Sequence, residues 1–353
     1  MREQAEIVVI GGGIYGTNIA YHLAKLGKKD VVLLEKGEIA SGESSHAAGV
    51  VTQFATSQAM MEFRKYSIEL YSSLGLFNHV GSLRVASSPE QLKELERSVS
   101  RAKGIGMDAE VISPDEAVKI MPQISKKDLY GAMYLPRDGH LDPYTTTTAM
   151  ARFARELGVT IYTHTRVTGI ELSQKGEVTK VLTDKGAIST SIVVNAAGLW
   201  GPQVAAFAGV RYPTTPVDHQ HVALKAVDGH EFTHDTPCLR DPDNLVYMRE
   251  EQGGLVVGGY EPNPFARWID GVPWEHGSKS LPPDYDRFEI LLEELFDVFR
   301  SWSGRGSLRS SAIPGHTRPT ASPCWDLSPG RAASGSRRAC RSTAMAAQAA
   351  WAS

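Results

Sequence analysis

Apolar and polar residues alternate along the chain in blocks that predict strands and helices in turn. The first block is an uninterrupted apolar run at residues 7–10, which predicts a parallel strand buried on both faces. Residues 18–26 have the apolar spacing of a helix, and Gly27 follows as a cap. A second apolar run at 31–34 ends in Glu35. The chain is therefore predicted to open with a strand, a helix and a second strand.

Glycines fill the turn between the first strand and the helix. Gly11 allows the tight turn, Gly13 lets the backbone approach a pyrophosphate, and Gly16 lets the helix pack on the strand. The N-terminus of the helix supplies N–H donors and the positive end of a dipole. Glu35 lies about 20 residues beyond the turn, where a carboxylate accepts hydrogen bonds from a ribose. A turn without a ligand is the alternative, but the coincidence of these parts favours a dinucleotide site.

A later apolar run repeats this arrangement and defines the domain organisation. Residues 192–194 are apolar, and Asn195 leads into the small residues of Ala196-Ala197-Gly198. Two such units separated by a long insertion predict one sheet interrupted by a second domain. From residue 213 the pattern changes to strands with glycine turns, which predict an antiparallel sheet. The expected fold class is α/β, with a Rossmann-like cofactor domain at 1–82 and 138–212, an antiparallel-sheet substrate domain at 83–137 and 213–300, and a tail at 301–353.

Composition and charge exclude several classes of function. The chain has 353 residues and a formal net charge of -3, so electrostatics favours neither nucleic acid nor an anionic membrane as a partner. No apolar run is long enough to span a bilayer, and no secretory leader is recognisable. Three cysteines without metal-ligand spacing argue against a disulfide framework or a zinc site. A reducing cytoplasm is the expected compartment.

Small residues crowd the loop that follows Glu35. Residues 36–51 are rich in Gly, Ala and Ser, which leave backbone N–H groups free to face a phosphate or a flat ring. His46 is the one side chain in this loop with strong functional chemistry. It is interpreted either as a ligand-contacting residue or as a loop histidine with a local hydrogen bond.

With these stretches collected, the chain resembles the flavin-dependent amine and amino-acid oxidoreductases of the D-amino-acid oxidase type, and within them the dimethylglycine and sarcosine dehydrogenase branch. The resemblance covers about residues 6–299. It is carried by separated motifs, namely the turn at 9–16, Ser45-His46-Ala47-Ala48-Gly49, Asp138-Gly139-His140-Leu141-Asp142-Pro143, Asn195-Ala196-Ala197-Gly198-Leu199-Trp200, Asp218-His219-Gln220-His221, Leu239-Arg240-Asp241-Pro242-Asp243 and Gly258-Gly259-Tyr260-Glu261-Pro262.

The resemblance implies FAD as the cofactor, with its flavin ring between the two domains. In that branch the histidine of the His-Ala-Ala-Gly stretch is the site of covalent flavin attachment, which corresponds to His46. The residues expected to bind the cofactor are Gly11, Gly13, Ile14, Tyr15, Gly16, Glu35, Lys36, Ser45, His46, Ala47, Ala48, Gly49, Ala197, Gly198 and Trp200.

The resemblance also implies catalytic roles for His219 and Tyr247 near the substrate nitrogen. A histidine there can hold the proton that leaves an ammonium before hydride departs from the adjacent carbon. A buried strand histidine and a core tyrosine are the structural alternative, and His221 is the other candidate histidine.

The implied reaction is oxidation of an N-methylated amino acid by hydride transfer to flavin N5, with oxygen or an electron-transfer protein as the acceptor. A D-amino-acid or proline-type dehydrogenase is one alternative. An inactive truncated flavoprotein is another, and it follows from the composition of the tail.

The tail differs from the rest of the chain. Residues 301–353 contain seven arginines, no lysine and one acid, together with three of the six tryptophans. A disordered basic tail is one interpretation, although such tails are poor in tryptophan and cysteine. Translated out of frame, the same codons can give a strand and a glycine-rich turn, which would end a flavin-binding domain sensibly. We hypothesise that this segment is a translated frameshift, which resequencing through the Arg300 codon tests.

Overall fold

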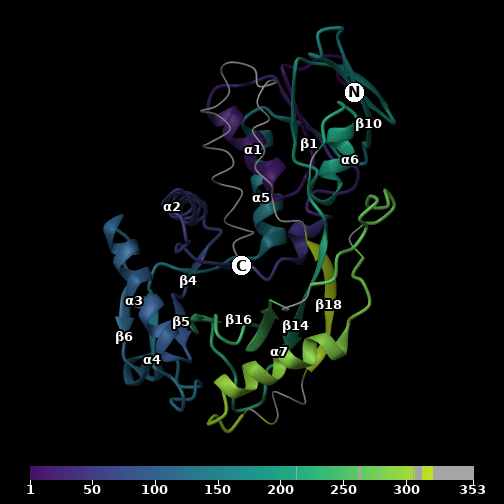
Figure 1. Cartoon of the computed structure of the whole chain (residues 1–353). Coiled ribbons are helices and arrows are strands. Elements are labelled where there is room, and N and C mark those ends of the chain that lie inside the picture. The colour runs from purple at the N-terminus through teal and green to yellow at the C-terminus, as the bar shows by residue number, and fades with distance from the viewer. Residues whose placement is uncertain (212, 261–263, 278, 305, 307–311, 321–353) are drawn as a thin grey trace.

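The two apolar runs that open the chain are neighbouring parallel strands. β1 (Ile7–Ile10) pairs with β2 (Val31–Leu34) on one side and with β13 (Ile192–Asn195) on the other, and β9 (Thr160–Tyr162) extends the sheet beyond β2. The strand order is β13-β1-β2-β9. The computed structural model describes residues 1–211, 213–260, 264–277, 279–304, 306 and, for the backbone, 312–320 (Figure 1).

Both faces of this parallel sheet are covered, which explains the unbroken apolar runs. On one face α1 (Ile14–Lys25) packs beside α5 (Pro143–Glu156), as Figure 1 shows. On the other face lies an antiparallel sheet of β10 (Val167–Leu172), β11 (Val178–Thr183) and β12 (Gly186–Ser189), with α6 (Gly201–Ala206) alongside. Alternate residues of β1 enter the two cores, Val9 the first and Val8 the second.

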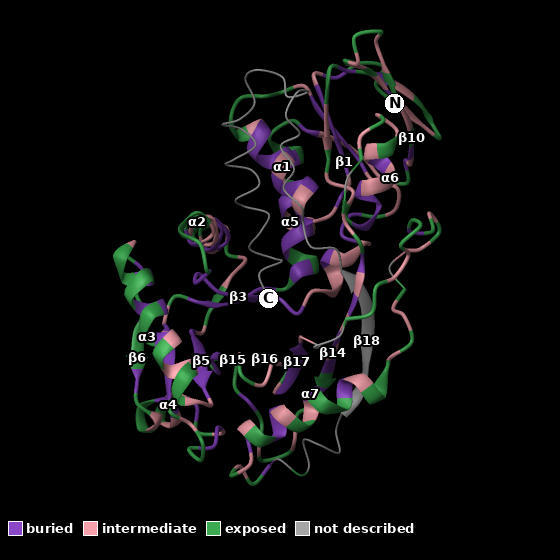
Figure 2. Ribbon diagram, in the orientation of Figure 1, coloured by how far each residue is buried: buried purple, intermediate pink, exposed green. Residues whose placement is uncertain are grey.

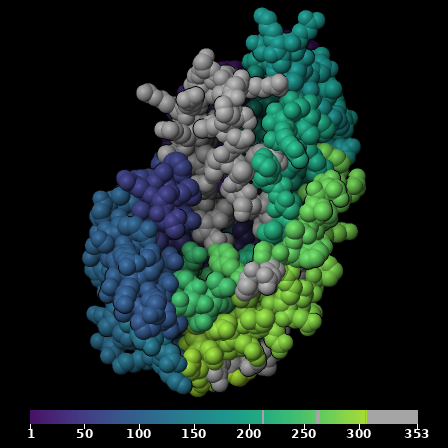
Figure 3. Space-filling view, viewed as in Figure 1, coloured from purple at the N-terminus to yellow at the C-terminus, as the bar shows by residue number. Residues whose placement is uncertain are grey.

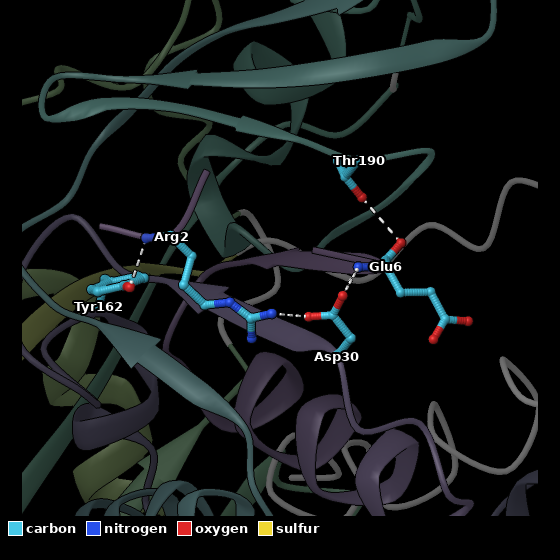
Figure 4. A network of polar contacts seen from close by, with 5 residues as sticks. All are labelled: Arg2, Glu6, Asp30, Tyr162 and Thr190. Carbon is cyan, nitrogen blue, oxygen red and sulfur yellow. Dashed lines mark hydrogen bonds and ion pairs between the residues drawn. The ribbon is translucent and has the colours of Figure 1, made fainter. Parts of the chain in front are cut away.

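A polar network joins the segments that precede β1, β2 and β13 (Figure 4). The Asp30 carboxylate accepts a hydrogen bond from the Glu6 N–H at 3.0 Å and forms an ion pair with Arg2. The Arg2 backbone N–H donates to the Tyr162 hydroxyl at 2.9 Å, and the Thr190 hydroxyl donates to the Glu6 carbonyl at 3.0 Å. The segments that precede β1, β2 and β13 therefore meet in this network, and Tyr162, the last residue of β9, joins it through its hydroxyl.

The second domain is built on an eight-stranded sheet of order β18-β14-β17-β16-β15-β5-β7-β6. Neighbouring strands are antiparallel except for β5 and β15, which are parallel and join the two halves of the sheet. The strands are β5 (Ser82–Ala86), β6 (Glu110–Ile112), β7 (Gly131–Leu135), β14 (Val217–Leu224), β15 (Cys238–Asp241), β16 (Val246–Glu251), β17 (Gly254–Gly259) and β18 (Ala312–Thr320).

The two faces of this sheet have different partners (Figure 2). One face packs on α7 (Tyr285–Val298) and α4 (Pro114–Ile120) in the largest apolar core, to which β14 contributes Val222 and Leu224. Tyr247 of β16 points to the opposite face, where it packs with Ala48 and Val50 of the first domain. α2 (Gln58–Ser73) and α3 (Pro89–Gly104) pack near the β5–β7 end. In Figure 3 the blue region around α3 lies at the lower left of the molecule, and the yellow-green segment around α7 lies toward the lower right.

The first domain also contains several short elements. β3 (Val50–Val51) and β4 (Asn78–His79) pair with β8 (Gly139–His140) in a small antiparallel sheet. The loop after β2 contains the 3₁₀ turn η1 (Glu43–His46), and η2 (Gly198–Trp200) follows β13.

The predicted architecture is confirmed: β1 and β13 are adjacent strands of one sheet that a second domain interrupts. α1 begins at Ile14, earlier than the apolar spacing indicated, because the glycine turn leads straight into the helix. The domain boundaries stay predictions. Of the proposed tail at 301–353, the structure describes residues 301–304, 306 and the strand β18, so the hypothesis for 321–353 lies outside the described residues. No helix in the described part is long and apolar enough to cross a membrane.

His140 generates a pH prediction. It lies in β8 with 8% of its surface exposed, and burial, with a further contribution from Arg249, lowers its pKa from 6.5 to about 4. The neutral form is therefore favoured in the folded protein, and the unfolded chain takes up the proton first as the pH falls. At about 1.4 kcal/mol per pKa unit, this histidine should lower the free energy of unfolding by about 3 kcal/mol between pH 6.5 and pH 4.

Urea unfolding of the wild type and of His140→Gln across this pH range measures the effect. The wild-type free energy of unfolding should fall more steeply with acidification than that of the variant. The difference between the two slopes should correspond to the uptake of nearly one extra proton on unfolding of the wild type. Parallel slopes for the two proteins would contradict the prediction.

Candidate cofactor site

A cavity of about 500 Å³ opens where the carboxyl ends of β1, β2 and β13 meet. Ligands of open parallel sheets bind at this edge, because the turns that follow adjacent strands diverge there. The cavity is lined by the glycine turn, the loop after β2, the start of β10, η2 and the segment that contains Trp274.

The backbone of the glycine turn allows a close approach of strand, helix and ligand. Gly11 has φ of +116°, a conformation that L side chains rarely adopt. A Cβ on Gly16 would overlap the Gly11 carbonyl, so α1 can pack this tightly only on a glycine. A Cβ on Gly13 would lie 3.0 Å from the Ser44 hydroxyl. Gly13 caps α1 without a side-chain bond, which leaves the first turn of the helix facing the cavity.

Glu35 is fixed in place by the backbone around it. Its Oε2 accepts the Gly12 N–H at 2.6 Å and its Oε1 accepts the Gly37 N–H at 2.7 Å. Each carboxylate oxygen has capacity for a further hydrogen bond. Since Glu35 lines the cavity, it can accept hydrogen bonds from ribose hydroxyls.

Ser44 is a cavity residue that sequence reasoning missed. Its hydroxyl accepts the Ile14 N–H at 2.9 Å, so it satisfies one free donor of the α1 N-terminus from the loop after β2. Thr165, Arg166 and Val167 at the start of β10 also line the cavity. Their positions depend on how the hairpin folds over the parallel sheet, and no local pattern marks them.

A segment of the second domain, which the sequence did not predict to take part in the site, forms one wall of the cavity. We name residues 265–277 the clasp. Its Trp274, Glu275 and Gly277 line the cavity. The ion pair between Arg267 and Asp218 anchors its first part to β14. Gln203 of α6 anchors the middle, since its amide exchanges hydrogen bonds with both the N–H and the carbonyl of Val272 at 2.9 Å.

Lys36 connects the clasp to the first domain. Its Nζ donates to the Trp274 carbonyl at 3.1 Å and to the His276 carbonyl at 2.8 Å. The same ammonium lies 3.7 Å from the centroid of the Trp200 ring, and Trp200 Nε1 donates to the Pro273 carbonyl at 3.1 Å. Burial is the main cause that lowers the pKa of Lys36. Lys36 and Trp200, both predicted to bind the cofactor, therefore hold the clasp as well as lining the cavity.

The loop that carries His46 lies outside this cavity, toward the second domain. His46 Nε2 is buried and has no hydrogen-bond partner among the described residues. Two residues later, the Ala48 carbonyl accepts a hydrogen bond from Arg249 Nε, which fastens the loop to β16. An unsatisfied buried nitrogen in a fastened loop is costly, and bond formation to a ligand would remove that cost.

Aromatic and imidazole side chains gather on the sheet face next to this loop. His219 Nε2 lies 3.0 Å from the Tyr247 hydroxyl, and Tyr260 packs against both rings at centroid distances of 5.6 and 5.7 Å. A Cβ on Gly258 would overlap the Tyr247 ring, so this glycine lets the tyrosine lie flat across β17 toward His219. The pair predicted from the sequence is thus in contact, while the roles of its members stay predictions.

The predicted cofactor residues fall into two groups. The cavity is lined by Gly11, Gly13, Ile14, Tyr15, Glu35, Lys36, Ala197, Gly198 and Trp200. The others are not part of its lining: Gly16 packs α1 on the turn, and Ser45, His46, Ala47, Ala48 and Gly49 lie in the loop that leads to Tyr247. Within the described residues no cluster of His, Cys, Asp and Glu could hold a metal ion.

Known proteins resemble this chain over most of its length. The family profile described as FAD dependent oxidoreductase matches residues 6–330. Mitochondrial dimethylglycine dehydrogenase of Rattus norvegicus is 34% identical over 310 residues, which are 84% of this chain and 36% of the relative. Mitochondrial sarcosine dehydrogenase of Homo sapiens is 35% identical over 308 residues, 81% of this chain and 33% of the relative. The chain spans about a third of the length of these curated relatives.

A solved structure has the same fold. The crystal structure of L-proline dehydrogenase from P.horikoshii superimposes with a TM-score of 0.80 at 26% sequence identity, and the match covers 99% of this chain and 93% of that one. The resemblance inferred from separated motifs is therefore confirmed at the level of both sequence and fold.

The clasp generates a binding prediction. In Lys36→Met the ammonium that joins the clasp to η2 is lost, and in Gln203→Ala the middle of the clasp is released without any change to the cavity lining. Both variants should bind ADP, a probe for the adenosine end of the site, about tenfold more weakly than the wild type, as measured by isothermal titration calorimetry. That loss corresponds to about 1.4 kcal/mol.

Lys28→Met is the matched control, because Lys28 is an exposed lysine that pairs with Glu6 on the surface at 2.6 Å. An unchanged ADP affinity in Gln203→Ala would show that the clasp does not contribute to this site.

Proposed function

The chain belongs to the family of FAD-dependent oxidoreductases, and from this premise we propose that it oxidises an N-methylated amino acid of the dimethylglycine or sarcosine type. The contact between His219 and Tyr247, beside the loop of His46, is the observation that carries the proposal. When bound, FAD supplies the hydride acceptor, and the residues of the chain bind, orient and manage protons.

The residues of the cavity fit the adenosine and pyrophosphate part of FAD. The glycine turn presents the N-terminus of α1, whose N–H donors and dipole suit a pyrophosphate. Glu35 suits the ribose hydroxyls, and Trp200, Trp274 and Lys36 enclose the remaining wall. A cavity of about 500 Å³ lies within the range of cofactor sites.

The loop of His46 fits the other end of the cofactor. It leads from the cavity to the sheet face where Tyr247 packs on Ala48, so a dinucleotide that begins at the glycine turn can extend along it. The unsatisfied His46 Nε2 supports the proposal that this nitrogen bonds to the flavin. Arg249 contributes by holding the Ala48 carbonyl and therefore the course of the loop.

His219 and Tyr247 are proposed to manage the proton of the substrate amine. A methylated ammonium must lose its proton before hydride leaves the adjacent carbon, because the lone pair on nitrogen drives that departure. His219 can accept this proton, since its Nε2 already lies 3.0 Å from a hydroxyl that can donate or accept. The Tyr260 ring packs against both members of the pair, at centroid distances of 5.6 and 5.7 Å.

The proposal leaves a choice of substrate amine and of electron acceptor to be tested. The alternative substrates are D-amino acids and proline, and the acceptor is either oxygen or an electron-transfer protein. Because the chain matches only about a third of each curated relative, steps carried out by the rest of those proteins are not assigned to it.

Anaerobic mixing of the FAD-bound protein with dimethylglycine, sarcosine, proline and D-alanine tests the proposal. The N-methylated amino acids should bleach the flavin absorbance, and proline and D-alanine should not. Bleaching by proline or D-alanine alone would replace the proposed substrate class. A protein that takes up no FAD would favour the inactive alternative.

The rate of bleaching tests the role of His219. His219→Gln should slow flavin reduction by about a hundredfold or more, which is the contribution of a positioned acid–base group. His221→Gln is the control, because His221 lies two residues along the same strand. A large loss in His221→Gln together with an unchanged rate in His219→Gln would reverse the assignment.

Acid precipitation tests the proposed covalent link at His46. In the wild type the flavin should sediment with the denatured protein and fluoresce on a denaturing gel. In His46→Ala it should appear in the supernatant. Wild-type flavin that leaves with the supernatant would exclude the link.

A further inference from the structure

The clasp, which forms one wall of the cavity, also borders the strand that carries His219. Its first residues run beside the start of β14, where the Asp218 N–H donates to the Phe265 carbonyl at 2.9 Å. The pairing of β14 with β17 begins at His221, so the clasp borders β14 just before His219. A single segment therefore touches both the cavity and the part of β14 that presents His219.

The residues on either side of His219 are anchored behind it. Side chains alternate between the two faces of a strand, so Asp218 and Gln220 share one face and His219 points to the other, toward Tyr247. Asp218 and Gln220 are both buried. The Gln220 amide exchanges hydrogen bonds with the backbone of Asp284, the N-cap of α7, at 2.8 and 3.2 Å. The course of β14 at His219 thus depends on what holds Asp218 and Gln220.

Asp218 depends on the clasp for its charge partner. The Asp218 side chain is 7% exposed. Arg267 Nε donates to its Oδ1 at 2.7 Å, and Arg267 Nη2 donates to its Oδ2, which makes the pair bidentate. Hydrogen bonds to Asp218 raise the pKa of Arg267. Withdrawal of the clasp would leave a buried carboxylate without its cation, which is costly. The positions of the clasp and of β14 are therefore energetically tied.

The far end of the clasp depends on the first domain, because Lys36 holds the carbonyl of His276. Between the two ends lies a strained turn. Trp268 has φ of +50°, which is uncommon for a bulky side chain, and its carbonyl accepts the Gly271 N–H at 2.9 Å. The Trp268 ring packs on the His276 ring at a centroid distance of 4.5 Å. Strain of this kind persists where surrounding contacts hold it, so the clasp needs its anchors at both ends.

We propose that the clasp couples the adenosine end of the cofactor site to the position of His219. An adenine nucleotide in the cavity orders the clasp, and the pair of Arg267 and Asp218 then holds β14 so that His219 lies beside Tyr247. Arg267 and Asp218 are positioning residues, since they act through His219. This inference rests on the proposed function for the role of His219, while the coupling itself rests on the contacts of the clasp.

Contacts in the cavity explain why a nucleotide would favour the ordered clasp. Trp274, Glu275 and Gly277 of the clasp line the cavity, so a nucleotide meets them only when the clasp is in place. A ligand shifts a conformational equilibrium by the difference in its affinity for the two states, and these contacts supply that difference. The effect is reciprocal, because anything that loosens β14 at His219 also weakens the grip on the nucleotide.

Hydrogen exchange of the flavin-free full chain, with and without saturating ADP, tests the coupling without any reaction. The His46→Ala background removes the proposed covalent link, so flavin can be stripped before ADP is added. ADP should slow exchange by about threefold or more in the glycine turn at 11–16, in the clasp and in β14 at 217–220.

The variant Arg267→Gln separates these three segments. ADP should still slow exchange in the glycine turn of this variant, which also shows that it is folded, but should no longer slow exchange at 217–220. Arg267→Lys keeps the charge without the bidentate geometry and should retain only part of the effect. Arg97→Gln is the matched control, since Arg97 is an exposed arginine that lies 3.8 Å from Glu94 on α3.

Three results would overturn the coupling. The first is slower exchange in the glycine turn with no change at 217–220 in the parent protein, which counts whether or not the variants fold. The second is protection at 217–220 that survives in both Arg267→Gln and Asp218→Asn. The third is a failure of ADP to slow exchange in any segment, because the cavity would then not be an adenosine site.

Flavin reduction separates this inference from the proposed function. In the FAD-bound protein, Arg267→Gln should lower the limiting rate of reduction about tenfold and leave the Kd of the amine within about twofold, because Arg267 positions His219 and does not bind substrate. A protein that no N-methylated amino acid bleaches, but in which ADP protects 217–220 through Arg267, keeps the coupling and loses the proposed reaction. Bleaching by dimethylglycine without ADP-linked protection keeps the reaction and removes the coupling.

Discussion

The contact between the start of α1 and the end of β1 is the constraint on which the rest of the structure depends. Gly16 packs against the Gly11 carbonyl so closely that no side chain fits between them. This contact aims the free N–H groups of α1 at the edge of the parallel sheet. Glu35 then locks the turn from β2 by accepting the Gly12 and Gly37 N–H groups. The Ser44 hydroxyl ties the loop after β2 to the same turn by accepting the Ile14 N–H, and the cavity opens beside this contact.

The apolar runs and the glycine spacing in the sequence predicted those parts of the fold that depend on residues close together in the chain. The runs at β1 and β2 are apolar because cores cover both faces of their sheet, and this requirement is visible in the residues themselves. The glycine spacing likewise reflects a close contact within six residues of the chain, where Gly16 packs on the Gly11 carbonyl. For the same reason, nine of the residues predicted to bind the cofactor line the cavity, and all nine lie in the first domain.

The remaining parts of the site depend on contacts between segments that lie far apart in the sequence. Lys36 donates to two backbone carbonyls of the clasp, more than 230 residues away. Every residue has a backbone carbonyl, so the sequence of the clasp does not indicate this contact. Arg267 becomes the partner of Asp218 only because the clasp folds back along the start of β14. Such a pairing is set by the packing of whole segments, so it cannot be read from either segment alone. The motif around Asp218 was recognised, whereas its partner was not.

Charged and hydroxyl groups lie on the face of the large sheet that meets the first domain. Arg84, Arg240 and Arg249 on this shared face carry positive charge, and Arg249 holds the carbonyl of Ala48. Had that face been apolar, it would pack more favourably in the absence of any ligand, because buried guanidinium nitrogens such as Arg84 Nε, which has no hydrogen-bond partner among the described residues, cost free energy. The chain instead keeps charged and hydroxyl groups where its two domains meet. Natural proteins accept such local costs mainly at functional sites, which agrees with the roles proposed for the shared face and the glycine turn.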